Sequence, residues 1–214
     1  MNYYKYSYKN SVVVISTLII LVLIIFIPIK IESYIDVFVI LISCFIHELL
    51  HGIGFKIFGH AKSKNINYGI SLEKGIMYAT CKEEINKKGL LISMILPFLV
   101  LTIILGIIGI LLNNHIFLVV ALYNLFGSSL DICAFIDLLK LKNIKYKDLD
   151  DNFGFILIGN NLDNKKFICL KLIEKGKYNN KIKAKDYRKL VISKFSIILL
   201  SLFTIIFILR VIKW

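Results

Sequence analysis

The sequence predicts an all-α polytopic membrane protein with about five transmembrane helices, a small cytoplasmic β-hairpin loop and a short basic cytoplasmic segment. Of its 214 residues, 57% are hydrophobic, and the mean hydropathy is +0.76. Soluble domains are usually only about 45–50% apolar. The apolar residues form runs long enough to cross a bilayer, and the lysines fall between these runs. The length allows a single membrane domain over residues 1–214 and no separate large domain.

Five apolar runs are expected to be the membrane spans. The first run ends at Pro28, and no small-residue cleavage site follows it, so we expect a retained helix rather than a signal peptide. The third run contains Pro97, which frees a backbone carbonyl and favours a kink. The predicted spans are approximately residues 12–29, 34–58, 89–112, 116–139 and 191–210.

The formal net charge of +13 comes almost entirely from lysine. If the amino terminus is cytoplasmic, then residues 1–11 and the cytoplasmic loops 59–88 and 140–190 carry nearly all the lysine, as the positive-inside rule requires. The basic segments lack the interleaved aromatic residues of a nucleic-acid-binding domain. We therefore expect the lipid bilayer as a partner, with its anionic lipids, and no nucleic acid. The four cysteines are scattered without a CxxC pair, so we expect free thiols.

The two cytoplasmic loops contain short β-prone runs. Residues 66–72 and 76–81 flank a Glu-Lys-Gly turn and predict a β-hairpin. The edge of this hairpin can pair with an extended peptide, or the hairpin can be a plain connector, and the sequence favours neither. In the second loop, residues 153–158 and 167–173 are candidate strands of a small subdomain. The same loop holds one acidic cluster, Asp148-Leu-Asp-Asp151, among its lysines.

The span at residues 34–58 contains the motif His47-Glu48-Leu-Leu-His51. In a helix, His47 and His51 lie one turn apart on the same face, with Glu48 beside them. Two imidazoles so placed can hold one zinc ion, and the glutamate can act on water at that ion. Polar groups at membrane depth are costly. Three together therefore favour a metal site over a chance His-Glu-His sequence in a buried helix bundle.

A catalytic zinc site usually has three protein ligands. Depth favours Asp131 as the third, because it and the two histidines lie roughly 22–24 Å from the outer edges of their spans at the helical rise. Asn124 precedes Asp131 by two turns, so its amide can contact a substrate carbonyl or oxyanion, or form an interhelical hydrogen bond. Asp137 points elsewhere and is expected to be solvated or paired with a lysine. The weaker alternatives for the third ligand are His60, His115, Glu73, Glu83 and Glu84.

An HExxH motif in one span and Asn124-Leu-Phe-Gly-Ser-Ser-Leu-Asp131 in a later span resemble the site-2 proteases, which are intramembrane zinc metalloproteases. More closely, residues 35–158 resemble the bacterial membrane family named "Putative zincin peptidase", domain of unknown function 3267. The hairpin-like loop, Pro97 and the Asp-rich stretch before Phe153-Gly-Phe155 carry the same likeness. Site-2 proteases typically have prolines in the Asn…Asp segment and a glycine after its aspartate, and this chain has neither.

The resemblance implies His47, His51 and Asp131 as zinc ligands and Glu48 as the general base toward a zinc-activated water. The expected function is a membrane-embedded zinc metalloprotease in a bacterial-type cell membrane. It would hydrolyse peptide bonds in or next to the membrane segments of a membrane protein or peptide substrate. One alternative is a non-proteolytic or vestigial zinc-binding membrane protein, such as a scaffold, immunity or accessory factor. Another is a transporter with a polar midplane site.

Overall fold

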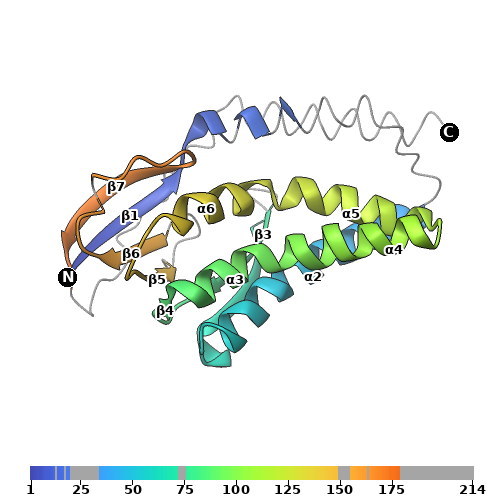
Figure 1. Ribbon diagram of the computed structural model, residues 1–214. Coiled ribbons are helices and arrows are strands. Elements are labelled where there is room, and N and C mark those ends of the chain that lie inside the picture. The colour runs from blue at the N-terminus through green and yellow to red at the C-terminus, as the bar shows by residue number, and fades with distance from the viewer. Residues whose placement is uncertain are drawn as a thin grey trace.

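The computed structural model describes residues 1–12, 14–16, 18–19, 34–71, 76–148, 155–162 and 164–178. In this part of the chain, long helices run side by side, and a five-stranded antiparallel sheet lies at one end of them (Figure 1). The fold is therefore mixed α/β, and the prediction of an all-α protein with five spans is wrong. The helices are α2 (Tyr34–Ile57), α3 (Lys87–Pro97), α4 (Leu105–Leu111), α5 (His115–Gly127) and α6 (Ser129–Leu139).

Two of the described helical segments are long and apolar enough to cross a membrane. One is α2, and the other is Lys87–Leu111, in which a π-helix (Phe98–Ile104) joins α3 to α4. A third candidate is α5 with α6, if this pair, bent by 52°, is one broken span. These segments match the predicted spans 34–58, 89–112 and 116–139. The predicted span 191–210 lies outside the described residues, as does most of the span 12–29.

The five-stranded sheet has the order β4-β5-β6-β1-β7, so the amino-terminal strand lies inside it. This sheet is what overturns the predicted all-α fold, in which residues 140–190 were a short basic cytoplasmic segment with two candidate strands. The candidate strands of that loop are confirmed in outline by β6 and β7. The strands are β1 (Asn2–Tyr8), β4 (Ile85–Asn86), β5 (Lys145–Asp148), β6 (Phe155–Gly159) and β7 (Leu170–Lys177).

Alternating tyrosines explain why the first residues form a strand. Tyr4 and Tyr6 are fully buried in the main hydrophobic core, while Lys5 between them points to the other face of the sheet. Aromatic residues favour such half-buried, pleated surfaces. Tyr6 pairs with Phe155 in β6, far along the chain. The same core contains Leu138 from α6, so the sheet is packed directly against the helices.

Asp137 anchors the start of β7 to α6. Its carboxylate is fully buried and accepts hydrogen bonds from the backbone amides of Ile168 and Cys169, each at 2.7 Å. The expectation of a solvated or lysine-paired Asp137 is therefore wrong, because the loop before β7 folds over it. This packing also brings Cys169 to Cys133, and the two form a disulfide with a Cα–Cα distance of 6.0 Å. Free thiols are confirmed only for Cys44 and Cys81.

The hairpin predicted in the first cytoplasmic loop is confirmed by β2 (Ile66–Ser71) and β3 (Ile76–Cys81), which pair in antiparallel register. It lies against α2, where Tyr68 covers Gly52, and any side chain at Gly52 would collide with the tyrosine hydroxyl. Close approach of backbone and side chain is a usual reason for glycine in a helix. A side chain at position 52 would therefore require the Tyr68 ring to move.

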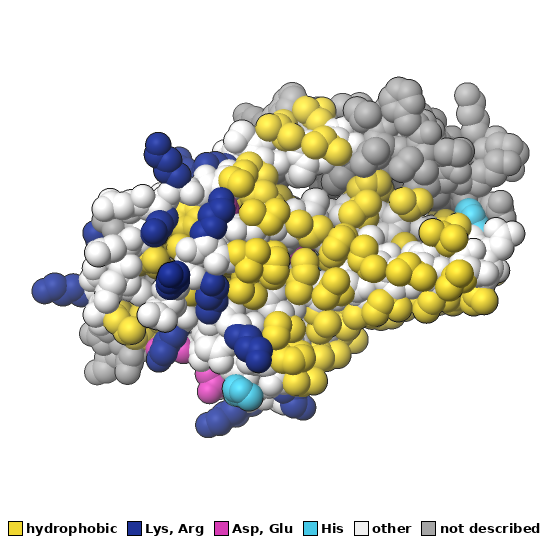
Figure 2. Space-filling model, viewed as in Figure 1, with side chains coloured by type: hydrophobic (Ala, Val, Ile, Leu, Met, Phe, Trp, Pro, Cys, Tyr) yellow, Lys and Arg dark blue, Asp and Glu magenta, His cyan; other side chains and the backbone are white. Residues whose placement is uncertain are grey.

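Hydrophobic and basic side chains are separated along the molecule. Figure 2 shows hydrophobic side chains over the helices and lysines gathered toward the end that carries the sheet. Many of these lysines are exposed, among them Lys142, Lys165 and Lys166. Apolar helices with basic flanks are typical of a protein whose helices lie in lipid and whose sheet lies in water.

Candidate metal centre

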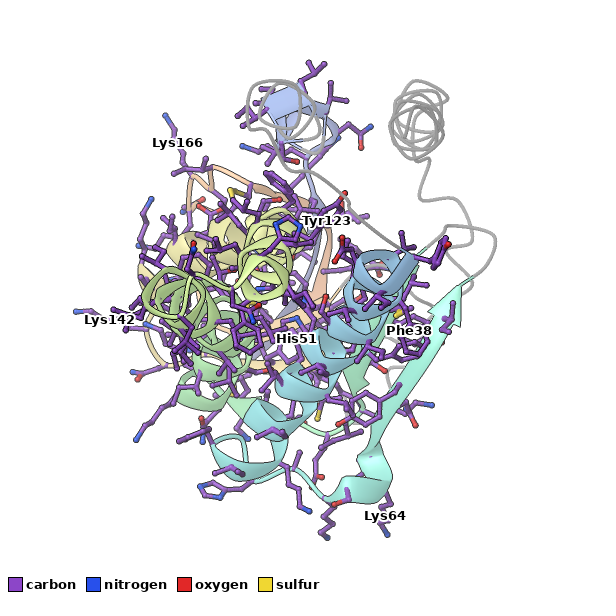
Figure 3. All side chains as sticks on the ribbon, turned by 90° about the vertical axis from the view of Figure 1, so that its right-hand side faces the viewer. Phe38, His51, Lys64, Tyr123, Lys142 and Lys166 are labelled. Carbon is purple, nitrogen blue, oxygen red and sulfur yellow. A yellow bond between two sulfur atoms is a disulfide. The ribbon has the colours of Figure 1, made fainter. Side chains whose placement is uncertain are left out.

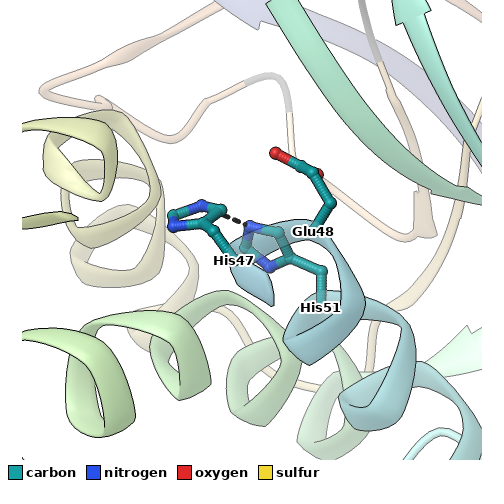
Figure 4. A group of neighbouring side chains, drawn as sticks. All are labelled: His47, Glu48 and His51. Carbon is teal, nitrogen blue, oxygen red and sulfur yellow. Dashed lines mark hydrogen bonds between the residues drawn. The ribbon is translucent and has the colours of Figure 1, made fainter. Parts of the chain in front are cut away.

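The two histidines of the motif meet on one face of α2. His47 and His51 are both buried, and their Nε2 atoms lie 3.1 Å apart. The ligand atoms of these two side chains and of Glu48 all lie within 4.8 Å of one another, so the group can hold a metal ion. Figure 4 shows the two imidazole rings close together and nearly perpendicular to each other, with the Glu48 side chain extending past them. The local helical spacing alone produces this part of the site.

Asp131 reaches the same point from another element. Its Oδ2 atom lies 3.4 Å from His47 Nε2 and 3.5 Å from His51 Nε2. Asp131 sits in the first turn of α6, just after the 52° bend that follows Gly127. The bend therefore directs the start of α6 toward α2. The structure brings together the three residues that the sequence analysis predicted as ligands.

The three donor atoms fit a tetrahedral metal ion. Zinc bonds to imidazole nitrogen and carboxylate oxygen are about 2.0–2.2 Å long, which places neighbouring donors of a tetrahedron about 3.3–3.5 Å apart. The separations among His47 Nε2, His51 Nε2 and Asp131 Oδ2 are 3.1, 3.4 and 3.5 Å. The donors thus form one triangular face of such a tetrahedron and leave its fourth vertex to another ligand.

Hydrogen bonds behind the rings fix which nitrogen faces the metal centre. His47 Nδ1 lies 2.7 Å from Asn124 Oδ1, and His51 Nδ1 lies 2.9 Å from the carbonyl oxygen of Ser93. Both partners are acceptors, so each Nδ1 carries a proton and donates it. In the neutral rings, the two Nε2 lone pairs then face each other and a carboxylate. Electron-donating atoms this close together repel one another unless a cation lies between them. A hydrogen bond from the other ring nitrogen to an acceptor is typical of metal-binding histidines.

Pro97 leaves free the Ser93 carbonyl that orients His51. Proline has no backbone N–H, so the carbonyl four residues earlier, that of Ser93, loses its helical partner. His51 takes that place, and the Ser93 hydroxyl donates in turn to the His51 carbonyl oxygen at 2.7 Å. The helix continues from Phe98 as a π-helix, a form often found at functional sites. The sequence alone predicts the freed carbonyl at Pro97, and the structure shows that His51 is its partner.

Asn124 lies on α5 behind His47, and its side chain reaches the end of α3. Its amide nitrogen donates to the carbonyl oxygen of Pro97 at 3.0 Å and to Thr102 Oγ1 at 2.9 Å. Its oxygen accepts from His47, so both ends of the amide are engaged within the protein. This geometry corresponds to the interhelical hydrogen bond considered from the sequence. It gives no support to the alternative contact with a substrate carbonyl or oxyanion.

The other candidates from the sequence lie away from the histidines. His60 is exposed, and His115 lies 3.8 Å from Asp36 at the start of α2. Glu83 accepts hydrogen bonds from the loop that precedes β2, and Glu84 pairs with Lys145. Glu73 lies outside the described residues. Figure 3, which looks along the helices from the end opposite the sheet, shows His51 among the helices, with Lys64, Lys142 and Lys166 at the periphery.

A cavity of about 350 Å³ opens beside the donors. Its wall includes the motif, part of β3 and the ends of β1 and β5. Glu48 also lines a second cavity of about 280 Å³ between α2 and the hairpin, so its carboxylate is accessible from both. Met77 and Tyr78 of β3 line both cavities as well, so this part of the hairpin lies beside Glu48.

Asp148, at the end of β5, also lines the larger cavity. Its Oδ2 atom accepts a hydrogen bond from the Cys81 backbone amide at 2.6 Å, and its Oδ1 accepts one from the Tyr146 hydroxyl. Burial raises the pKa of Asp148 to about 7, although both hydrogen bonds oppose that rise. The sequence analysis noted this residue only as part of an acidic cluster, because β5 lies next to the motif only in the folded chain.

Comparison with known proteins gives one match. The sequence model of a family described as "Putative zincin peptidase", domain of unknown function 3267, matches residues 40–146, which is half of the 214-residue chain. The matched part includes the HExxH motif, the hairpin, Pro97 and Asp131. No curated protein and no solved structure matches the chain.

Proposed function

The chain belongs to the putative zincin peptidase family, and on that premise we propose that it is a zinc-dependent endopeptidase of the membrane. It would cleave peptide bonds in or next to membrane segments of a protein or peptide substrate. The observation that carries this proposal is the convergence of His47, His51 and Asp131, whose donor atoms have the spacing of a zinc site.

The chain's own residues hold and orient this centre. His47, His51 and Asp131 would bind the ion through two nitrogens and one oxygen. Asn124 and the Ser93 carbonyl are positioning groups, because each fixes one imidazole through its Nδ1 proton. When bound, zinc supplies a Lewis acid that polarises a carbonyl and lowers the pKa of water.

Glu48 is the residue placed for proton transfer. It would take the proton of the attacking water as general base and later deliver it to the leaving amine. Its carboxylate lines both cavities and lies within 4.8 Å of the histidine donors, so substrate and water can both reach it.

The membrane placement follows from the separation of lysines and apolar helices. We place the sheet, with the amino terminus, in the cytoplasm, because the described lysines gather at that end and the positive-inside rule applies to such segments (Figure 2). The metal centre then lies in the half of the membrane nearer to the cytoplasm. A helical substrate must unwind before cleavage, since its carbonyls are otherwise hydrogen bonded. The edge of β3 offers backbone partners for the unwound stretch.

Metal removal tests this function. Full-length protein in lipid nanodiscs is incubated with a library of apolar peptides, and the products are identified by mass spectrometry. We expect cleavage that a chelator abolishes and that one equivalent of zinc restores, because the three donors form a single site. Zinc binding without cleavage of any peptide would contradict the peptidase function and favour a non-proteolytic metal protein.

A further inference from the structure

The edge of β3 away from β2 lies beside two carboxylates. Among the described strands, β3 pairs only with β2, and the amide of Lys82 just beyond it donates to the carbonyl oxygen of Asn65 on the β2 side. Alternate amides of a strand point to opposite edges, so Cys81 and Ala79 share the edge away from β2. Cys81 donates to Asp148, and Ala79 lines the same cavity as Glu48. The two amides are two residues apart, which is about 6.6 Å along the strand.

Asp148 also limits how far along β3 a bound peptide can pair. Because its Oδ2 occupies the Cys81 amide at 2.6 Å, an extended peptide can pair with β3 only before that point. Asp148 and Glu48 line the same cavity of about 350 Å³. A peptide group that reaches Asp148 would therefore lie near a peptide bond placed at Glu48.

The basic side chains in the described wall of this cavity are the two histidines, which would be neutral as metal ligands. The chain has 27 lysines and arginines, yet none is among the described residues that line this cavity. A divalent ion would offset the charges of Asp131 and Glu48. The hydrogen-bond donors to Asp148 are the Tyr146 hydroxyl and the Cys81 amide, and both are neutral. An incoming cation would thus meet one uncompensated carboxylate in a largely apolar surrounding, where charge-assisted hydrogen bonds are strong.

We propose that Asp148 binds a positively charged group of the peptide substrate, an ammonium or guanidinium near the cleaved bond. This inference rests on the proposed function and adds the substrate class to it. The cationic group can be a lysine or arginine side chain or a free amino terminus. All of them offer N–H donors to the same carboxylate.

The test measures peptide binding separately from cleavage. Full-length Glu48→Gln protein in nanodiscs is titrated with three fluorescent peptides of one apolar sequence. The first carries lysine at the variable position and an acetylated amino terminus, and the second carries norleucine there and is also acetylated. The third carries norleucine and a free amino terminus. We expect the lysine or the free-terminus peptide to bind at least about tenfold more tightly than the neutral peptide, as hydrogen bonds to charged groups allow.

Asp148→Asn keeps the shape of the side chain and removes its charge. In the Glu48→Gln protein, it should abolish the preference for the cationic peptide and leave the Kd of the neutral peptide within about twofold. With Glu48 intact, Asp148→Asn should raise KM for the cationic peptide with little change in kcat. Glu83→Gln is the matched control, because this carboxylate accepts hydrogen bonds from the loop before β2 and does not line the cavity, and its replacement should change neither value.

The outcomes separate this inference from the peptidase function. The cation site would be overturned if all three peptides bound with equal affinity or if none of them bound. It would also be overturned if Asp148→Asn weakened the binding of all three peptides equally. Cleavage without a cationic preference would leave the peptidase and remove the inference. A preference that depends on Asp148, in a protein that cleaves no peptide, would leave the cation site and remove the peptidase.

The preference should also depend on pH. The groups facing Asp148 are Tyr146, Cys81 at the end of β3, Tyr8 from β1 and His51 from α2. Burial raises the pKa of the Cys81 thiol to about 11, and it also raises the pKa of both tyrosines, so these groups stay neutral near pH 7. Asp148, with a pKa of about 7, ionises in this range. The affinity for the lysine peptide divided by the affinity for the acetylated norleucine peptide should rise from pH 6 to pH 8. In Asp148→Asn, this ratio should not change with pH.

Discussion

Replacing Glu48 with glutamine is expected to abolish peptide cleavage while the protein keeps its metal. Glutamine preserves the size of the side chain and its contact with β3, but it cannot accept the proton of water. General acid–base groups contribute typically 10²–10⁴-fold, so kcat should fall by about 10³-fold or more. Zinc content, measured on the same purified sample, should remain at one ion per chain, because the donors are His47, His51 and Asp131.

Glu83→Gln is the control for this experiment. Glu83 is a half-buried glutamate whose carboxylate accepts hydrogen bonds from the backbone of Lys62 and the side chain of Asn65. Its replacement should leave both zinc content and cleavage unchanged. Continued cleavage by Glu48→Gln would remove Glu48 as the base. Loss of zinc in that variant would instead make Glu48 a ligand.

Replacing Asp131 with alanine is expected to remove the metal. Only this residue brings α6 into the ligand set, and its oxygen lies 3.4 and 3.5 Å from the two histidine nitrogens. Loss of a group behind a metal ligand typically costs about 10–100-fold in affinity, so loss of a ligand itself should cost more than about 100-fold. A competition titration with a zinc chelator measures this, and cleavage should disappear in parallel.

Asp137→Asn, on the same helix, is the matched control for Asp131→Ala. Asp137 holds three backbone amides of the loop before β7 and lies away from the histidines. Its replacement should lower the thermal stability of the protein in detergent, since each buried donor left without a good partner costs about 1–3 kcal/mol. Its zinc affinity should stay unchanged. If the two variants lose zinc to the same extent, the fold of α6 rather than the Asp131 carboxylate maintains the site.

Local pattern and depth were enough to predict much of the metal centre. The spacing of His47 and His51 is a property of one helix, and the depth of Asp131 follows from counting residues along a span. The hairpin was recognisable because both its strands and its turn lie within one short stretch. In each case the residues lie close together in the sequence, or their depth can be counted from the edge of the bilayer.

Contacts between distant segments were not predictable in this way. β1 was not predicted, because its pairing with β6 and β7 is seen only in the structure. The sequence of an amino-terminal strand does not indicate partners so far along the chain. The same holds for the disulfide between Cys133 and Cys169. One missed link did have a local sign: Pro97 always frees the carbonyl of Ser93, and a buried histidine needs an acceptor. Only the structure shows that His51 supplies the partner.

X-ray absorption at the zinc edge of the purified full-length protein tests most directly whether α2 and α6 meet around a metal ion. The proposed site predicts two imidazole nitrogens and at least one carboxylate oxygen, all at about 2.0–2.2 Å. A protein that binds no zinc at equimolar concentration would contradict it. So would a shell with a zinc–sulfur distance of about 2.3 Å, which would indicate a cysteine in place of Asp131.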